Sequence, residues 1–137
     1  MQVTLKLIDN MKLEARNSEN HITYFDGKKE MGADYSAATP MEVMLETLGG
    51  CSMMDVIAIL KKKRKTIEEL NVKIEADRAA THPMVFTKVE VIYSLKSPDT
   101  EIIDLEKAVQ LSQEKYCSVS AMFRNSGCEV TYNCELV

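Results

Sequence analysis

Hydrophobic and polar residues alternate along the first part of the chain. Val3, Leu5 and Leu7 alternate with polar residues, and a period of two places apolar side chains on one face of a β-strand. The pattern returns twice before residue 26, and two polar clusters that favour turns separate the runs: Asp9-Asn10 and Asn17-Ser18-Glu19-Asn20. Residues 1–26 are therefore predicted to form a meander of three strands.

A long stretch with few charges follows an aperiodic segment, residues 26–38, which is predicted to be a loop. The stretch begins with Thr39 as a helix cap, Pro40 at the first helical position and Glu42 three residues after the cap. A glutamate at that position reaches back to the backbone amide of the cap. We therefore expect a helix from Pro40 to about Lys63.

This helix is apolar on nearly every side, so we expect it to be a central helix buried on most faces. Residues 41–60 approach the length that spans a bilayer. Charged side chains are costly in lipid, and the stretch contains Glu42, Glu46 and Asp55 as well as two glycines. Burial inside a protein is the better interpretation than a membrane span.

The rest of the chain contains three further strand patterns and two helical ones. Two runs with period two, residues 72–76 and 85–93, are predicted to pair across Thr81-His82-Pro83. A helical pattern opens at Pro98-Asp99 and runs to Tyr116, a short helical run covers 118–123, and residues 128–137 alternate again. This order predicts a single α+β domain, 1–137, in which helices cover antiparallel sheet.

Composition agrees with a folded, acidic protein. The chain has 137 residues, 45% hydrophobic and 28% charged, with a formal net charge of −4, so we expect no general nucleic-acid binding. The basic run Lys61-Lys62-Lys63-Arg64-Lys65 lies where the long helix ends, where cations complement the helix dipole. The N-terminus lacks the apolar block of a secretory signal, and we expect a cytoplasmic protein.

Four cysteines in a reducing compartment favour free or transiently oxidised thiols over a disulfide scaffold. Cys128 and Cys134 share the apolar face of the last strand with Val130, Tyr132 and Leu136. A buried cysteine behaves as a small hydrophobic residue, so these two are predicted to be core residues.

Cys51 and Cys117 have different surroundings. Cys51 shares a helical face with Asp55 and follows Gly49-Gly50; the glycines either leave room for a molecule to reach the sulfur or permit close helix packing. Cys117 precedes the short helical run, where unpaired amides would stabilise a thiolate; the alternative is a tolerated cysteine at a helix cap. Their separation along the chain leaves open whether they meet.

No motif for a metal or a cofactor accompanies these thiols. The chain has no Cys-x-x-Cys spacing, and its two histidines, His21 and His82, have no paired ligand spacing. Zinc sites usually show such spacings. We therefore expect no metal, haem or other cofactor.

Three motifs together resemble the family of osmotically induced protein C and organic hydroperoxide resistance protein. They are Thr39-Pro40 with an acidic residue just downstream, Gly49-Gly50-Cys51, and Glu114-Lys115-Tyr116-Cys117-Ser118-Val119. His82-Pro83 before Phe86 also fits, the resemblance covers essentially the whole chain, and it is strongest to the less-characterised small members. It implies an intertwined homodimer in which antiparallel sheets wrap around long central helices, with peroxide-reducing sites at the subunit interface.

The resemblance also implies roles for individual residues. Cys51, eleven residues after Pro40, matches the cysteine that attacks the peroxide, and Cys117 matches the one that resolves it. An arginine from the N-terminal strands lowers the thiol pKa in the family; Arg16 is the sole arginine before the helix, although it could equally be an exposed charge at a strand end.

The glutamate that orients this arginine marks a departure from the family pattern. It directly follows the proline in the well-described peroxidases, whereas here Met41 stands there and Glu42 comes next. A shift by one residue rotates a helical side chain by about 100°. Glu42 thus either takes the role of that glutamate or serves only as the capping partner.

The resulting hypothesis is a thiol-dependent hydroperoxide reductase that converts organic hydroperoxides to alcohols and is reset by a dithiol. The apolar residues around Cys51 favour organic substrates: Met44, Leu48, Met53 and Met54. Asp55 is expected to be a packing or interface residue. The alternative is a catalytically silent member of the same fold that binds a small ligand.

Overall fold

The computed structural model describes all 137 residues, which form two compact units, Met1–Glu46 and Thr47–Val137. The boundary between them falls inside the long helix α1 (Pro40–Lys62). That residues 1–137 make a single domain stays a prediction.

The N-terminal unit contains the predicted meander. Its antiparallel sheet has the order β1-β2-β3, with β1 at Val3–Asp9, β2 at Lys12–Asn17 and β3 at Ile22–Phe25. The turns contain Asn10 and Asn20 with φ of 48° and 63°, a left-handed conformation that asparagine tolerates. Both turns that the sequence predicted are therefore present, and each contains an asparagine in the left-handed conformation.

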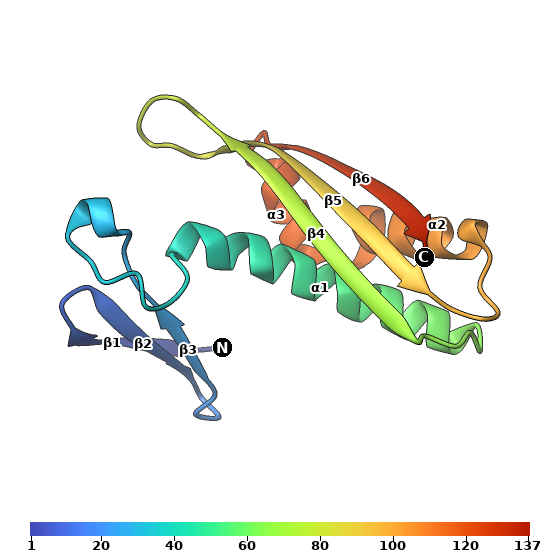
Figure 1. Ribbon diagram of the computed structural model, residues 1–137, viewed down its shortest axis with the longest axis horizontal. Coiled ribbons are helices and arrows are strands. Elements are labelled where there is room, and N and C mark those ends of the chain that lie inside the picture. The colour runs from blue at the N-terminus through green and yellow to red at the C-terminus, as the bar shows by residue number, and fades with distance from the viewer. The chain divides into compact units, whose positions relative to one another are not determined.

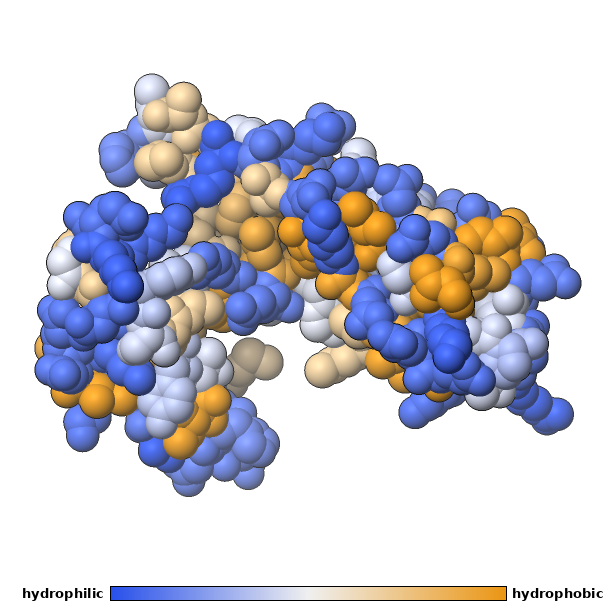
Figure 2. Space-filling model, viewed as in Figure 1, coloured by the Kyte–Doolittle hydropathy of each residue, from blue (hydrophilic) through white to orange (hydrophobic).

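Strand β1 leaves its apolar residues uncovered. The exposed fractions of Val3, Leu5 and Leu7 are 62%, 57% and 61%. The space-filling view shows hydrophobic residues among hydrophilic ones on the surface of both units (Figure 2). A strand with period-two alternation normally buries its apolar face, so this face of β1 lacks a covering layer within one chain.

The predicted loop before α1 contains a single short 3-10 turn, η1 (Lys29–Met31). Asp26, at 2% exposure, anchors this loop by accepting hydrogen bonds from the backbone amides of Gly27 and Ser36 and from the Ser36 hydroxyl, at 2.7, 2.8 and 2.9 Å. The Ser36 amide is the main reason that the pKa of Asp26 lies below its ordinary value. The loop is therefore fixed by one buried carboxylate.

Helix α1 starts as predicted. The backbone amide of Thr39 donates to the Glu42 carboxylate at 2.7 Å, and the Glu42 amide donates to Thr39 Oγ1 at 3.4 Å. These two bonds are the reciprocal pair of a capping box. The Thr39 amide, followed by the hydroxyl of Tyr35, lowers the pKa of Glu42. The predicted start at Pro40 is confirmed, and the end falls at Lys62, one residue before the expected position.

The basic run at the end of α1 is tied to the second helical region of the chain. Lys63 and Lys65 form ion pairs with Asp104 at 3.1 and 3.0 Å. The backbone amide and the hydroxyl of Thr66 donate to Asp99 at 2.8 and 2.9 Å. These contacts fix the turn that leads from α1 into the second sheet.

The C-terminal unit contains the second sheet, with β4 (Glu69–Arg78), β5 (Phe86–Lys96) and β6 (Glu129–Leu136) in the order β4-β5-β6. The strands β4 and β5 pair in antiparallel fashion as predicted, but β6 runs parallel to β5. The reason is the connection, because parallel neighbours require a crossover segment. Here α2 (Ile102–Leu111), η2 (Ser112–Tyr116) and α3 (Ser118–Asn125) supply it.

One face of this sheet carries the helices (Figure 1). Alternate residues of β5 are fully buried on that face: Val89, Val91, Tyr93 and Leu95. The Tyr93 hydroxyl contacts both α1 and η2, and Phe86 stacks on Phe123 of α3 with ring centroids 5.7 Å apart. The core of the unit therefore lies between β5 and the three helices.

Helix α1 buries one face only, in contrast to the expectation that it is buried on most faces. Its buried residues follow a helical spacing: Leu48, Gly49, Ser52, Val56 and Leu60. Met44 and Met54 are 46% and 73% exposed, because one chain supplies a single layer against the helix. By length and composition α1 could cross a membrane, a test that core helices of soluble proteins also meet.

Candidate dithiol site

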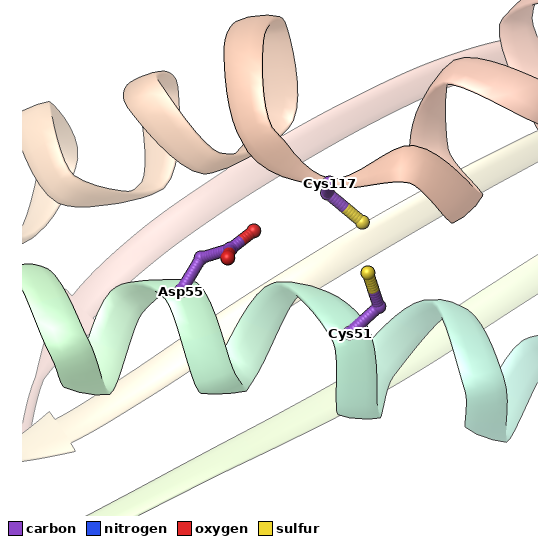
Figure 3. Close-up of side chains that lie close together, drawn as sticks. All are labelled: Cys51, Asp55 and Cys117. Carbon is purple, nitrogen blue, oxygen red and sulfur yellow. The ribbon is translucent and has the colours of Figure 1, made fainter.

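Two cysteines and one carboxylate come together in the C-terminal unit. Cys51 and Asp55 project from successive turns of α1 toward Cys117, and the two sulfur atoms face each other (Figure 3). The two sulfurs and a carboxylate oxygen of Asp55 all lie within 4.8 Å of one another. The predicted common face of Cys51 and Asp55 is confirmed, and the open question of whether the two cysteines meet is answered.

The backbone around Cys117 places its sulfur toward α1. The π-helical turn η2 ends at Tyr116, Cys117 is extended with φ −70° and ψ 101°, and α3 begins at the next residue. Turns of this kind are frequent at functional sites. The Cys117 sulfur accepts a hydrogen bond from the Ser120 amide at 3.3 Å, so Cys117 caps α3, a role that the sequence had left open beside that of a reactive thiolate.

The helix start was expected to favour a Cys117 thiolate, but burial has the larger effect on the pKa of this thiol. Cys117 is 3% exposed, and burial raises its pKa to about 11, while the amide of Ser120 acts in the opposite direction and the neighbouring Cys51 thiol adds to the rise. Cys117 is therefore a protonated thiol at neutral pH.

Asp55 is held in place from the crossover segment. The hydroxyl of Ser112 in η2 donates to Asp55 Oδ2 at 3.0 Å, and Ser112 itself is fully buried. The other carboxylate oxygen has no hydrogen bond within the chain. Asp55 is therefore positioned within the site, whereas the sequence indicated only a packing or interface residue.

A buried polar network lies directly behind the two cysteines. Tyr93 on β5 shares a hydrogen bond of 2.6 Å with Ser52 and accepts one of 2.7 Å from the side-chain amide of Gln113. The Ser120 hydroxyl donates to Gln113 Oε1 at 2.6 Å. Ser52 directly follows Cys51, and the backbone amide of Ser120 donates to the Cys117 sulfur. The network therefore connects the backbone near both cysteines to Tyr93 of the sheet. The sequence did not predict this network, and its only local signals are a serine directly after Cys51 and another three residues after Cys117.

The two glycines before Cys51 serve different purposes. A Cβ on Gly49 would lie 3.1 Å from Cδ1 of Ile74 on β4, whereas a Cβ on Gly50 would meet no atom within 4 Å. Close packing, here against a strand, therefore accounts for Gly49. Gly50 leaves open space beside Cys51, which agrees with the alternative that a glycine here lets a molecule reach the sulfur.

The other two predicted site residues lie in the N-terminal unit. Arg16 on β2 is paired with Glu14, its Nε donating to Oε1 at 2.5 Å. Glu42 binds Thr39 in the capping box and accepts a hydrogen bond of 2.8 Å from the Tyr35 hydroxyl. Within this unit Arg16 and Glu42 do not pair with each other, and their roles toward Cys51 stay predictions.

Of the remaining cysteines, Cys128 lies in the core as predicted, whereas Cys134, also predicted to be a core residue, is less deeply buried. Cys128 is 5% exposed and Cys134 is partly buried, and all four cysteines are free. Burial raises the pKa of Cys128, and raises that of Cys134 to about 11. Neither belongs to the cluster of Cys51, Asp55 and Cys117, so both provide controls for experiments on that cluster.

The fold that holds these two cysteines is that of the OsmC-like proteins. The sequence model of the family described as OsmC-like protein matches residues 32–133, and the chain belongs to this family. A relative, Protein YhfA of Escherichia coli K12, is 31% identical over 137 residues, which cover 100% of this chain and 98% of that protein.

Solved structures share the fold. A hypothetical protein from Aquifex aeolicus VF5 is 31% identical with a TM-score of 0.85, over 99% of this chain and 95% of that one. The organic hydroperoxide resistance protein OsmC from Legionella pneumophila, described as a predicted redox protein, is 14% identical with a TM-score of 0.69, over 98% and 97% of the two chains. These solved structures show that the chain shares the OsmC fold over nearly its whole length.

Proposed function

We propose that this protein is a thiol-dependent reductase of organic hydroperoxides, with Cys51 as the peroxidatic and Cys117 as the resolving cysteine. The observation that carries the proposal is the approach of the two sulfurs, which lie within 4.8 Å of each other although the residues are far apart in the chain. A disulfide requires a sulfur–sulfur distance of about 2.05 Å, so the two sulfurs must move closer together for the bond to form.

In the first step the Cys51 thiolate attacks one oxygen of the hydroperoxide. The O–O bond breaks, the alkoxide leaves and takes up a proton to become the alcohol, and Cys51 becomes a sulfenic acid. Cys51 suits this role better than Cys117 because it is half-buried, while Cys117 is nearly inaccessible. Gly50 adds open space on the same turn.

In the second step the Cys117 sulfur attacks the Cys51 sulfur. The S–O bond of the sulfenic acid breaks, the hydroxyl leaves with the proton from the Cys117 thiol as water, and an intramolecular disulfide forms. Burial raises the pKa of Cys117, which favours its protonated form and disfavours its direct oxidation by the peroxide. An external dithiol then reduces the disulfide and is itself oxidised to a disulfide.

We assign Arg16 and Glu42 to the same reaction, with Arg16 favouring the Cys51 thiolate and Glu42 orienting the arginine. We further propose that the protein is a homodimer in the cytoplasm. The uncovered apolar face of β1 and the exposed methionines of α1 support a second subunit, since an apolar surface of this kind is commonly an interaction site.

Apolar surface near Cys51 supports an organic substrate over hydrogen peroxide. Met54, three residues along the helix, is 73% exposed, and Met53 is partly buried. Methionine side chains are flexible and adapt to varied apolar groups. We therefore expect faster oxidation by cumene hydroperoxide than by hydrogen peroxide at equal concentration.

The test counts free thiols. Reduced protein is treated with one equivalent of cumene hydroperoxide, denatured and assayed; the wild type should lose two of its four thiols, and Cys51→Ser should lose none. Cys128→Ser is the matched control, because it removes a thiol outside the cluster and should still lose two. Unchanged counts in the wild type would contradict the proposal and leave the catalytically silent, ligand-binding alternative.

A further inference from the structure

We propose that reduced Cys51, Asp55 and Cys117 form a binding site for one zinc ion. The donor set is two sulfurs and one carboxylate oxygen, from two successive turns of α1 and from the cap of α3. The site does not depend on the proposed reductase activity, because binding requires only that both thiols be reduced.

The chemistry of the donors selects the ion. Thiolates and carboxylates are zinc ligands, whereas Mg²⁺ and Ca²⁺ prefer oxygen donors alone. Three protein ligands leave the fourth tetrahedral position for water, as in zinc sites with an open position. The ligands carry three negative charges when deprotonated, which the divalent ion largely offsets.

The geometry requires little adjustment. Zinc binds sulfur at about 2.3 Å and carboxylate oxygen at about 2.0–2.2 Å, which sets tetrahedral donors about 3.5–4 Å apart. The three donor atoms already lie within 4.8 Å of one another. Cys51 and Asp55 are four residues apart on one helix, a spacing used by helical zinc ligands.

The groups behind the donors are also in place. The Ser112 hydroxyl holds one oxygen of Asp55 at 3.0 Å and leaves the other free of hydrogen bonds, and the Ser120 amide holds the sulfur of Cys117 at 3.3 Å. Such outer contacts orient zinc ligands and contribute to affinity. Asp55, which the reductase chemistry does not use, acquires a function in this arrangement.

This site differs from the sequence-based expectation that no zinc is bound. That expectation rested on the absence of a short-range motif, but the third ligand, Cys117, reaches the pair on α1 only through the packing of the crossover segment. Because zinc and the proposed disulfide both use Cys51 and Cys117, they exclude each other. Zinc would hold the thiol pair in its reduced form.

The test is a zinc titration of the reduced, metal-free full chain in competition with a chromogenic chelator under anaerobic conditions. The wild type should take up about one zinc per chain. Cys51→Ser and Cys117→Ser should lose the site, and Asp55→Asn should bind at least about tenfold more weakly. Cys128→Ser and Cys134→Ser, which remove thiols outside the cluster, should bind as the wild type does.

A second measurement on the wild type alone guards against variants that fail to fold. Zinc at one equivalent should protect Cys51, but not the similarly exposed Cys134, from alkylation, as read by mass spectrometry. Absence of zinc uptake, half a zinc per chain, affinity unchanged in Asp55→Asn, or alkylation of Cys51 that zinc does not slow would each overturn the proposal. None of these results depends on whether peroxide is reduced, so the two proposals fail separately.

Discussion

Single polar side chains hold the two cysteines in place, and Tyr93 is the centre of that arrangement. It is fully buried, and its hydroxyl joins Ser52 to Gln113. Tyr93→Phe would leave two buried polar groups short of a partner, and this costs about 1–3 kcal/mol. We expect the free energy of unfolding to fall by that amount, as measured by urea denaturation of the reduced protein.

Tyr132→Phe is the matched control for that variant. Tyr132 lies on β6 and is only partly buried, and burial and nearby charges, rather than a hydrogen bond, shift the pKa of its hydroxyl. Removing this hydroxyl should change the unfolding free energy by less than about 0.5 kcal/mol. Equal losses in the two variants would show that the network around Tyr93 contributes nothing specific.

Cys134 provides a prediction for pH dependence. Its pKa is raised from 9.0 to about 11 by burial, so the folded state binds its proton more tightly than the unfolded state does. This contribution to stability is complete below about pH 9 and is lost as the pH rises to about 11. Between about pH 9 and pH 11, the free energy of unfolding of reduced protein should therefore fall less in Cys134→Ala than in the wild type. Parallel pH profiles would contradict the burial of this thiol.

At the scale of elements, the start of α1 separates a structural role of Glu42 from a chemical one. Glutamine also completes a capping box, so Glu42→Gln should keep the unfolding free energy within about 0.5 kcal/mol. If Glu42 orients Arg16 as proposed, the same variant should oxidise Cys51 more slowly at equal cumene hydroperoxide. An unchanged oxidation rate would leave Glu42 with the capping role alone.

Element boundaries were largely predictable from the sequence, whereas pairing direction was not. The period-two runs marked β1 to β5, and Thr39-Pro40 marked the start of α1, because these signals are local. The parallel direction of β6 depends on how α2 and α3 cross over the sheet, and no local pattern encodes it. The meeting of Cys51 with Cys117 depends on the same crossover, so spacing alone left it open.

Burial was the other property that local patterns did not determine. The apolar composition of α1 indicated burial on most faces, but Met44 and Met54 are exposed in one chain. Likewise, the position of Cys117 at the start of α3 predicted a thiolate. Burial among the surrounding segments has the larger effect and raises the pKa of Cys117 to about 11. Both results depend on neighbours distant in sequence.

At the scale of the whole molecule, the uncovered face of β1 leads to a prediction about assembly. If this face contacts a second subunit, Leu5→Lys combined with Leu7→Lys should convert a dimer to a monomer in light scattering after size-exclusion chromatography. The control Thr4→Lys adds a single positive charge on the opposite face of the strand and should stay dimeric. A monomeric wild type would contradict the proposed homodimer.

The central claim is that Cys51 and Cys117 are one redox-active pair, and a disulfide map tests it most directly. Reduced protein is treated with one equivalent of cumene hydroperoxide, alkylated, digested without reductant and analysed by mass spectrometry. We predict one dominant cross-link, between the peptides that contain Cys51 and Cys117, and its disappearance after treatment with a dithiol. A link through Cys128 or Cys134, or no link at all, would contradict the account.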